Sequence, residues 1–240
     1  MTNILKAIDK EKEYLSYRME GKEPFHLVDA VKECGFNSLD EYFTAKRRYE
    51  ISQMDVVKVA SKDATVTIQD FIVNQKHGFA YCVHDEKLAF VAKDEDVNAD
   101  ACEEYGYMIL DTRHTGGVVV VNRGDISVVF FGAVGNQVMQ DFAMYLIDRY
   151  KEKGLNATYE GNDVLIDGYK ISGLSATPYG HIQYSTIHIG VNTNLDHIKA
   201  ICKKPMVKVP KGLSEYGITT EEVEQMFLDF CKRDTVRKDT

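Results

Sequence analysis

The sequence predicts an α+β protein in which helices pack against a mixed, mostly antiparallel sheet. Two observations lead to this prediction. Apolar residues recur at helical spacing over the first 50 or so residues, and short alternating segments rich in Val, Ile, Phe and Tyr follow from about residue 53. The 240 residues are enough for one large domain with an appendage. We therefore divide the chain into a helical appendage, 1–52, and a main domain, 53–240.

The appendage is predicted to contain three helices. Its first helix has apolar residues at helical spacing (Ile4, Leu5, Ile8, Leu15 and Met19) and ends at the break formed by Gly21–Pro24. A short helix then ends at Gly35, and Ser38 with Glu41 forms a capping box that opens a third. The unit could bind a partner or a regulator, or it could be a flap packed on the main domain.

The main domain alternates short strands with four helices. Strands are expected at 56–59, 66–72, 79–83, 88–92, 107–110, 156–159, 164–166, 169–172 and 183–191. Helices are expected at 98–105, 138–153 and 196–202. A fourth helix is expected to begin at a Thr219–Glu222 capping box and to end at about residue 233. The segments 118–121 and 126–131 are expected to form a hairpin around the turn Asn122–Asp125.

Composition excludes several classes of function. With 29 basic and 37 acidic residues the net charge is −8, which argues against general nucleic-acid binding. No apolar run reaches the roughly 20 residues that span a bilayer, and the first residues are charged, so we expect a cytoplasmic protein. The five cysteines are scattered and form no CxxC pair, so we expect neither a disulfide framework nor a metal site.

Three segments stand out as candidates for chemistry, and the third, Gln183–Val191, fits an ordinary strand when taken alone. In Asp111–Val118, the adjacent Gly116 and Gly117 let a ligand approach the backbone amides, and Arg113 adds a bidentate donor for phosphate or carboxylate. In Asn162–Gly173, Lys170 lies beside apolar residues that could hold its ammonium at a fixed point. Taken alone, the glycines also fit an ordinary turn and the lysine an exposed edge strand.

Taken together and in order, these segments resemble the lipoate–protein ligase family, which has the biotin and lipoate ligase fold. The family's Asn-Asp matches Asn162–Asp163, and its Gly-x-Lys-Ile-Ser-Gly matches Gly168–Gly173, with Lys170 on the family's lysine. Its Arg-x-Ser-Gly-Gly pattern matches Arg113, His114, Thr115, Gly116 and Gly117, with threonine for serine. Its His-Gly-Thr-Leu strand resembles Gln183–Val191, with Thr186 matching.

The resemblance is incomplete at the glycine turn. Thr112 replaces the family's first arginine, Val118 its third glycine, and Asn122–Arg123 its His-Asp pair. After the lysine segment, Leu174–Ser175 replaces Ser-Ala. The chain ends after one helix, so the C-terminal accessory domain of many ligases is expected to be absent or a separate subunit.

The resemblance implies a two-step reaction. ATP and lipoate, or octanoate, form an acyl-adenylate, and the acyl group then passes to a lysine of a lipoyl domain. Lys170 would stabilise charge in both steps, and residues 113–117 would hold the adenylate phosphate. Asp163, Ser172, Gly173 and Thr186 complete the implied substrate site. Mg²⁺ would arrive with ATP, and the acyl tail would lie in an apolar slot.

Two alternatives remain open at this stage. A related branch transfers octanoyl or lipoyl groups through a cysteine near the lysine segment, but no cysteine lies between Cys102 and Cys202. A divergent member without activity could bind an acyl or nucleotide ligand, or a protein partner through its N-terminal helices.

Overall fold

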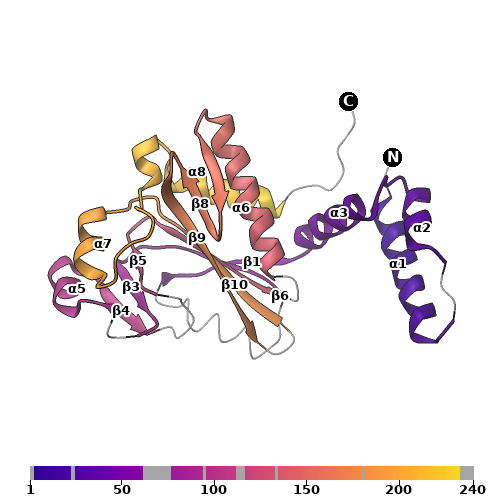
Figure 1. Cartoon of the computed structure of the whole chain (residues 1–240), viewed down its shortest axis with the longest axis horizontal. Helices are drawn as coiled ribbons and strands as arrows, with labels where there is room; N and C mark the ends of the chain where they lie inside the picture. Colours follow the sequence, from indigo (N-terminus) through magenta and orange to yellow (C-terminus); the bar gives the residue numbers. More distant parts are fainter. Residues whose placement is uncertain are drawn as a thin grey trace. The chain divides into compact units, whose positions relative to one another are not determined.

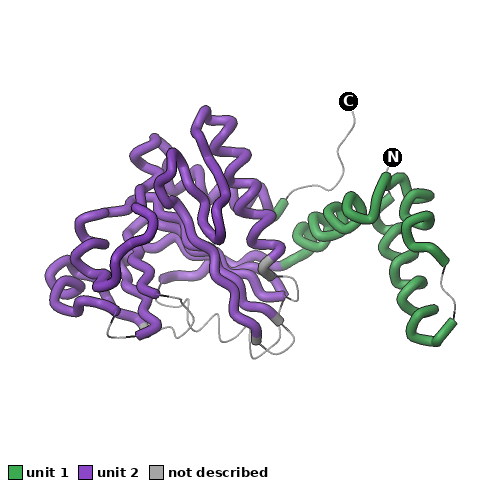
Figure 2. The backbone as a smooth tube through the Cα atoms, in the orientation of Figure 1, with its two compact units in different colours: residues 1–54, 231–240 green, residues 55–230 purple. Residues whose placement is uncertain are grey.

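The computed structural model describes residues 3–22, 25–61, 77–93, 96–111, 117–132, 135–179 and 182–232. The chain divides into two compact units, residues 1–54 with 231–240, and Asp55–Phe230 (Figure 2). The predicted strand at 66–72 lies outside the described residues.

The first unit is helical, as predicted. It contains α1 (Ile4–Met19), α2 (Leu27–Glu33) and α3 (Leu39–Ser52). Ser38 opens α3, because its hydroxyl accepts the Glu41 amide at 3.1 Å, while the Glu41 carboxylate accepts the amide of Asn37 at 2.8 Å. The three helices bury a small shared core of Ala7, Val31, Cys34, Phe36 and Tyr42.

The second unit is built on a mixed sheet of seven strands (Figure 1). Its order is β1-β2-β6-β10-β9-β8-β7, and every neighbouring pair is antiparallel except β1 and β2. The strands are β1 (Asp55–Lys58), β2 (Gly78–Val83), β6 (Ile126–Gly132), β7 (Ala157–Glu160), β8 (Asp163–Ile166), β9 (Tyr169–Tyr179) and β10 (Ile182–Ile189). The predicted α+β class is confirmed.

One face of this sheet, the helix face, is covered by α6 (Gly135–Glu152) and α8 (Thr220–Cys231). Phe79 of β2 lies opposite Phe130 of β6 on this face, with ring centroids 5.0 Å apart. Both rings are fully buried, and Phe227 of α8 packs 5.6 Å from Phe79. This aromatic layer forms a hydrophobic core between the sheet and the helices.

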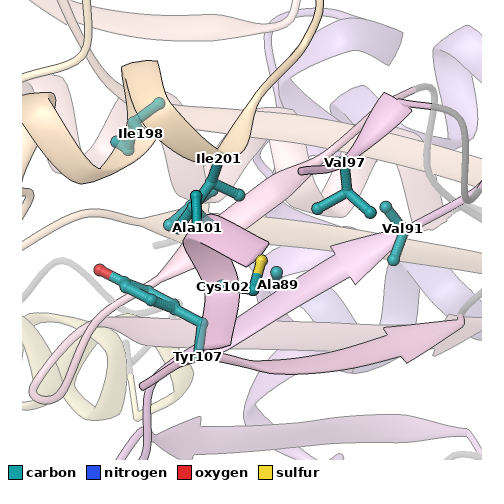
Figure 3. Packing of buried hydrophobic residues seen from close by; sticks show 9 residues of the cluster. Ala89, Val91, Val97, Ala101, Cys102, Tyr107, Ile198 and Ile201 are labelled. Atoms are coloured by element: carbon teal, nitrogen blue, oxygen red, sulfur yellow. The ribbon is translucent and has the colours of Figure 1, made fainter. Parts of the chain in front are cut away.

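A second, smaller sheet has the order β4-β3-β5, from β3 (Leu88–Val91), β4 (Met108–Asp111) and β5 (Val119–Val121). The helices α5 (Ala99–Tyr105) and α7 (Leu195–Ile201) pack on it through Ala101, Cys102, Ile198 and Ile201 (Figure 3). Asn98 and Asn194 cap these helices through their side chains.

The predicted hairpin of 118–121 and 126–131 is wrong. β5 pairs with β3, whereas β6 pairs with β2 and β10 in the other sheet. The turn between them is anchored to distant segments, because Asp125 accepts the amides of Val191 and Asn192 and the Gly124 amide donates to the His84 carbonyl. The connection therefore carries the chain from one sheet to the other.

Other predicted elements are confirmed with shifted ends. β9 runs to Tyr179 instead of ending near Ser172, and α6 begins at Gly135. The Thr219–Glu222 capping box is formed in both directions, at 3.2 and 2.9 Å. In the described part of the chain, no helix combines the length and apolar character that a membrane crossing requires.

Candidate active site

A β-bulge positions Lys170. On β8 and β9, Asp163 pairs with Gly173 and Leu165 with Lys170, and the register shifts between Val164 and Leu165. The bulge inserts one extra residue into β9, so Lys170 and Gly173 share a face despite their odd spacing. We call this the site face; it is the face of the seven-stranded sheet opposite to the helix face.

The Lys170 ammonium lies above Gly173 and pairs with the Asp163 carboxylate. Its Nζ lies 2.8 Å from Asp163 Oδ1, with the lysine side chain 39% exposed and the aspartate side chain 18% exposed. A Cβ on Gly173 would lie 3.1 Å from this Nζ and 3.2 Å from Asp163 Oδ1. The absence of a side chain at 173 therefore leaves room for the ion pair.

A second ammonium completes this group. Lys208 Nζ lies 3.1 Å from Asp163 Oδ2 and 2.9 Å from the Glu160 carbonyl oxygen. Its segment is held against β9, because the Lys170 amide donates to the Val209 carbonyl at 2.9 Å. Lys208 was not predicted from the sequence, since nothing in its local pattern shows that this loop returns to β9.

Polar residues continue across the site face from Gly173. In register, Gly173 pairs with His188, His188 with Ser127, and Ser127 with Cys82. Ser127 Oγ lies 3.2 Å from His188 Nδ1 and 2.9 Å from His84 Nε2. His84 is buried, and this burial, followed by the charge of His188, lowers its pKa to about 4.

Asp125 anchors the end of this row. Its Oδ2 lies 3.7 Å from His188 Nε2 and accepts the Asn122 amide at 2.8 Å, while Oδ1 accepts the amides of Val191 and Asn192 at 2.7 and 2.9 Å. Burial alone would raise the pKa of this carboxyl, but His188 and the donated amides outweigh burial and lower it. Asp125 is therefore an ionised carboxylate.

An apolar patch adjoins the polar row on the same face. It consists of Ala80, Val129, Phe131 and Tyr184, which lie two or four residues away from Cys82, Ser127 and His188 on the same strands, all towards the same end of the sheet. Phe131 and Tyr184 pack with ring centroids 5.4 Å apart. Between the patch and Lys170 lie Thr186 and Ser175, whose hydroxyl oxygens are 2.6 Å apart. The face thus places apolar surface beside polar groups.

The structure brings together some of the residues expected from sequence. Lys170, Asp163, Gly173 and Thr186 all lie on the site face. Ser172 does not, because it pairs with Val164 on the helix face, where it is 2% exposed and its Oγ has no hydrogen-bonding partner among the described residues. Gly117 is described and precedes β5, whereas Arg113, His114, Thr115 and Gly116 lie outside the described residues.

The cysteines offer no activated thiolate. All five are free, and burial raises the pKa of Cys82, Cys102, Cys202 and Cys231, that of Cys202 to about 11. Cys82 lies on the site face, but it is 2% exposed. A thioester intermediate needs a thiolate within reach of substrate, whereas burial favours the protonated thiol at these four cysteines.

A protein-held metal also does not fit these residues. The part of the chain that the structure describes contains no group of three His, Cys, Asp or Glu side chains placed to hold a metal ion. The nearest carboxylate to Lys170, Asp163, is already paired with two ammonium groups. A cation bound there would have to displace them.

The fold and this lysine site define a class of protein. The lipoyl protein ligase A/B catalytic domain family matches residues 90–231. The chain belongs to this family, and it is an enzyme of the lipoate–protein ligase and transferase class. A search of the curated proteins finds no match in sequence.

Solved structures share the fold. A putative lipoate protein ligase from T. acidophilum with bound lipoic acid superposes with a TM-score of 0.59 at 16% identity, covering 74% of this chain and 83% of that one. Lipoate-protein ligase A bound with ATP gives 0.62 at 14% identity, with the same coverage. LipL1 of P. falciparum, in complex with lipoate, gives 0.58 at 15% identity, covering 77% and 63%. At these identities the likeness concerns the fold.

Proposed function

We propose that this protein activates lipoate or octanoate with ATP to an acyl-adenylate, and transfers the acyl group to a lysine of a lipoyl domain. The observation that carries the proposal is Lys170, which is fixed on the site face by Asp163 over Gly173. Family membership supports the reaction class. The proposed substrate site comprises Arg113, His114, Thr115, Gly116, Gly117, Asp163, Gly173 and Thr186; the side chain of Ser172, on the helix face, is left out of it.

Lys170 has the geometry for electrostatic catalysis. A positive charge preorganised next to the reacting carbonyl and phosphate stabilises the negative charge that develops in both steps. Its amide and carbonyl are hydrogen-bonded to Val209 and Lys211, so the backbone at Lys170 is fixed on both sides. Asp163 orients the ammonium, and Lys208 balances the charge of Asp163. The role of Asp163 is therefore to position Lys170.

The apolar patch suits the hydrocarbon tail of the acyl substrate. Ala80, Val129 and Phe131 are buried, and Tyr184 packs against them. Because Ala80, Val129 and Phe131 are at most 9% exposed, a medium-length chain would have to take the place of the atoms that now cover them, and each CH₂ group that it buries there contributes roughly 0.8 kcal/mol. Such a chain would direct its carboxyl group towards Thr186, His188 and Lys170. The structure therefore supports a lipoyl or octanoyl substrate over a polar acid.

The proposed reaction also requires a nucleotide and an acceptor protein. The solved ligase bound with ATP supports ATP as the second substrate, and we propose that Mg²⁺, which shields triphosphates, arrives with the nucleotide. The archaeal system from Thermoplasma acidophilum is described as a bi-partite ligase with its E2 lipoyl domain. By analogy we propose a lipoyl domain as acceptor, an accessory subunit as a further partner, and the cytoplasm as the location.

We make a separate proposal for the N-terminal helices. We assign residues 1–52 as an appendage and 53–240 as the catalytic domain. Within the first unit, Lys46 and the Tyr42 hydroxyl both bond Glu11 at 2.6 Å, which ties α1 to α3. Because this unit has its own core, we expect it to affect partner choice more than the chemical steps.

The experiment is a two-stage assay on the full chain. The protein is incubated with ATP, Mg²⁺, lipoate and an apo lipoyl domain, and the domain is weighed by mass spectrometry; a parallel reaction supplies preformed lipoyl-AMP. We expect acyl mass on the domain in both reactions. Transfer only from lipoyl-AMP would mean that this chain does not perform the adenylation alone, which a separate accessory subunit would explain.

A matched pair of lysine variants tests the role of Lys170. Lys170→Ala should lose transfer, while Lys153→Ala, whose ammonium pairs with Glu222 on the surface, should keep it. Absence of acyl mass from wild type in both reactions, or equal activity of Lys170→Ala and wild type, would overturn the proposal and leave a ligand-binding or partner-binding family member.

A further inference from the structure

Three residues of the polar row have the arrangement of a nucleophile, a base and an orienting carboxylate. Ser127 Oγ lies 3.2 Å from His188 Nδ1, and the other ring nitrogen, Nε2, lies 3.7 Å from Asp125 Oδ2. The second distance is longer than a hydrogen bond, as is common for catalytic contacts without substrate. A serine, a histidine and an aspartate in this order are recognised by geometry and role, whatever their order in sequence.

The hydrogen-bonding groups around these residues fix the direction of the proton. An ionised Asp125 favours a proton on the His188 nitrogen that faces it, Nε2, and in that neutral tautomer His188 accepts at Nδ1. The Ser127 hydroxyl must then donate to His188, and its oxygen accepts from His84 Nε2 at 2.9 Å. His84 in turn accepts at Nδ1 from Ser61, 3.3 Å away. When His84 and His188 are both neutral, the hydroxyl hydrogen of Ser127 therefore points at His188 Nδ1.

Asp125, His188 and Ser127 differ in how far they are buried. The Asp125 side chain is 1% exposed and ionised, whereas the His188 side chain is 21% exposed and Ser127 is half-buried. Asp125 already receives three backbone amides, which is sufficient to anchor the turn without His188. The imidazole and the hydroxyl therefore face the site with a fixed carboxylate behind them.

The position of Ser127 suits an acyl group. Val129 and Phe131 of the apolar patch follow Ser127 at two-residue steps on the same face of β6. A hydrocarbon tail packed on these side chains, in place of the atoms that now leave them at most 9% exposed, would bring its carbonyl carbon to the end of the patch, beside Ser127. Directly opposite side chains on neighbouring strands are about 5 Å apart. His188 therefore separates Ser127 from Gly173, above which Lys170 lies.

We propose that Ser127 is a nucleophile that carries the acyl group as an ester, with His188 as general base and Asp125 orienting His188. In this respect the inference rests on the proposed function, which supplies the acyl-adenylate. Ser127 Oγ attacks the acyl carbon, the bond from that carbon to the phosphate oxygen breaks, and AMP leaves with the electron pair. The serine proton moves to His188 Nδ1 and from there to water.

The second half of the reaction regenerates the free hydroxyl of Ser127. A neutral acceptor amine attacks the ester carbon, its proton passes to His188 Nδ1, and the bond between carbon and Oγ breaks as His188 gives that proton to Oγ. The product is an amide, and Ser127 is restored. This route replaces the thiolate of the cysteine-dependent transferases with a hydroxyl, which explains how a transferase step is possible although burial raises the pKa of Cys82, Cys102, Cys202 and Cys231.

A serine-directed probe tests the site without relying on ligase activity. Wild-type protein is treated with an alkyl fluorophosphonate, and the labelled peptide is identified by mass spectrometry. We expect one modified serine, Ser127. In His188→Gln the labelling rate should fall by about 100-fold or more, the usual contribution of a general base. An unlabelled Ser127 in wild type, or equal labelling of His188→Gln, overturns the inference.

A matched serine serves as the control. Ser175 is also half-buried on the site face, but among the described residues its hydroxyl contacts Thr186 and no imidazole. Ser175→Ala should label like wild type, whereas Ser127→Ala should not label. Because the labelled peptide of the wild-type protein decides the question, a folding defect in a variant does not leave the result open.

A second readout separates this inference from the proposed function. With preformed lipoyl-AMP and no acceptor, wild type should gain one acyl mass that hydroxylamine removes, and Ser127→Ala should not. Transfer to the lipoyl domain at wild-type rate by folded Ser127→Ala would refute the ester while the proposed function stands. Fluorophosphonate labelling of Ser127 without any lipoyl transfer would refute the proposed function while the nucleophile stands.

Discussion

The two faces of the seven-stranded sheet differ in composition although the same strands supply both. On β6, Ile126, Val128 and Phe130 face the helices and are fully buried, while Ser127 and Val129 alternate with them on the site face. β10 repeats this pattern, with Ile187 and Ile189 on the helix face and Thr186 and His188 on the other. Successive side chains point to opposite faces, so residues that stabilise the fold alternate along each strand with residues that face the site.

This comparison predicts that substitutions on neighbouring residues have different effects. A change on the helix face should lower the free energy of unfolding, because it opens a cavity in the aromatic core. A change on the site face should alter the reaction more than stability, because polar groups there hold ligands and protons. The variants below are ordered from the largest expected effect to the smallest.

Phe130→Ala should have the largest effect on stability. Its ring is fully buried against Phe79, and truncation of a core phenylalanine costs about 3–5 kcal/mol. Chemical denaturation followed by circular dichroism measures the change. The site-face control Ser175→Ala should cost about 1 kcal/mol, the value of one hydrogen bond. Similar losses in the two variants would contradict the division between the faces.

Lys170→Ala should have the largest effect on activity. Loss of a preorganised positive charge at a developing oxyanion reduces kcat by roughly 100- to 1000-fold. The ion pair with Asp163 is partly exposed, so the free energy of unfolding should change by less than about 1 kcal/mol. Steady-state kinetics with lipoyl-AMP measures the first value, and denaturation the second. A stability loss above this range would indicate a structural role for Lys170.

His84 should make stability depend on pH. Its pKa is lowered from the ordinary value of 6.5 to about 4 in the folded protein, so the unfolded chain binds the proton first as pH falls. The stabilisation is complete above about pH 6.5 and is lost towards pH 4, by up to about 3 kcal/mol. Below that range, Asp125 adds a loss of the same sign, because its pKa is lowered too.

The measurement is the free energy of unfolding between pH 7 and 4 for wild type and His84→Gln. The variant keeps a polar side chain but cannot titrate, so its curve should be flatter by the contribution of His84. Parallel curves for the two proteins would show that His84 is not the group responsible.

Gly173→Ala should have the smallest effect of the four. The added methyl group would lie 3.1 Å from Lys170 Nζ, so the flexible end of the lysine must shift by a few tenths of an ångström. We expect kcat to fall by about 10-fold with stability within about 1 kcal/mol, because small misplacements of catalytic groups are costly. Unchanged kinetics would mean that the position of Lys170 over Gly173 is not critical.

Local chemistry explains which elements could be predicted. The caps at Ser38 and Thr219, and the alternation along β6 and β10, act over a few residues and appear directly in the sequence. The hairpin prediction failed for a different reason. The turn Asn122–Asp125 has good local turn residues, but contacts with Val191 and Asn192 decide where its strands go.

For the site, the sequence indicated Lys170, Asp163, Gly173 and Thr186, and these share one face. It also selected Ser172, whose side chain lies on the helix face because it alternates with Gly173 along β9. It did not select Lys208, Ser127, His188 or Asp125 as a group. Serine and histidine 61 residues apart carry no local signal of contact, and only strand pairing brings them to 3.2 Å.

The sequence by itself determined the α+β class, the helical N-terminal unit and the lysine segment that identifies the family, because periodicity, capping and short motifs are local properties. Only the tertiary structure decided which residues meet. The bulge at β8 and β9 turned Lys170 towards Gly173, the returning loop added Lys208, and the order of strands aligned His188 with Ser127. These contacts depend on register between distant segments, and register is set by burial of a whole face.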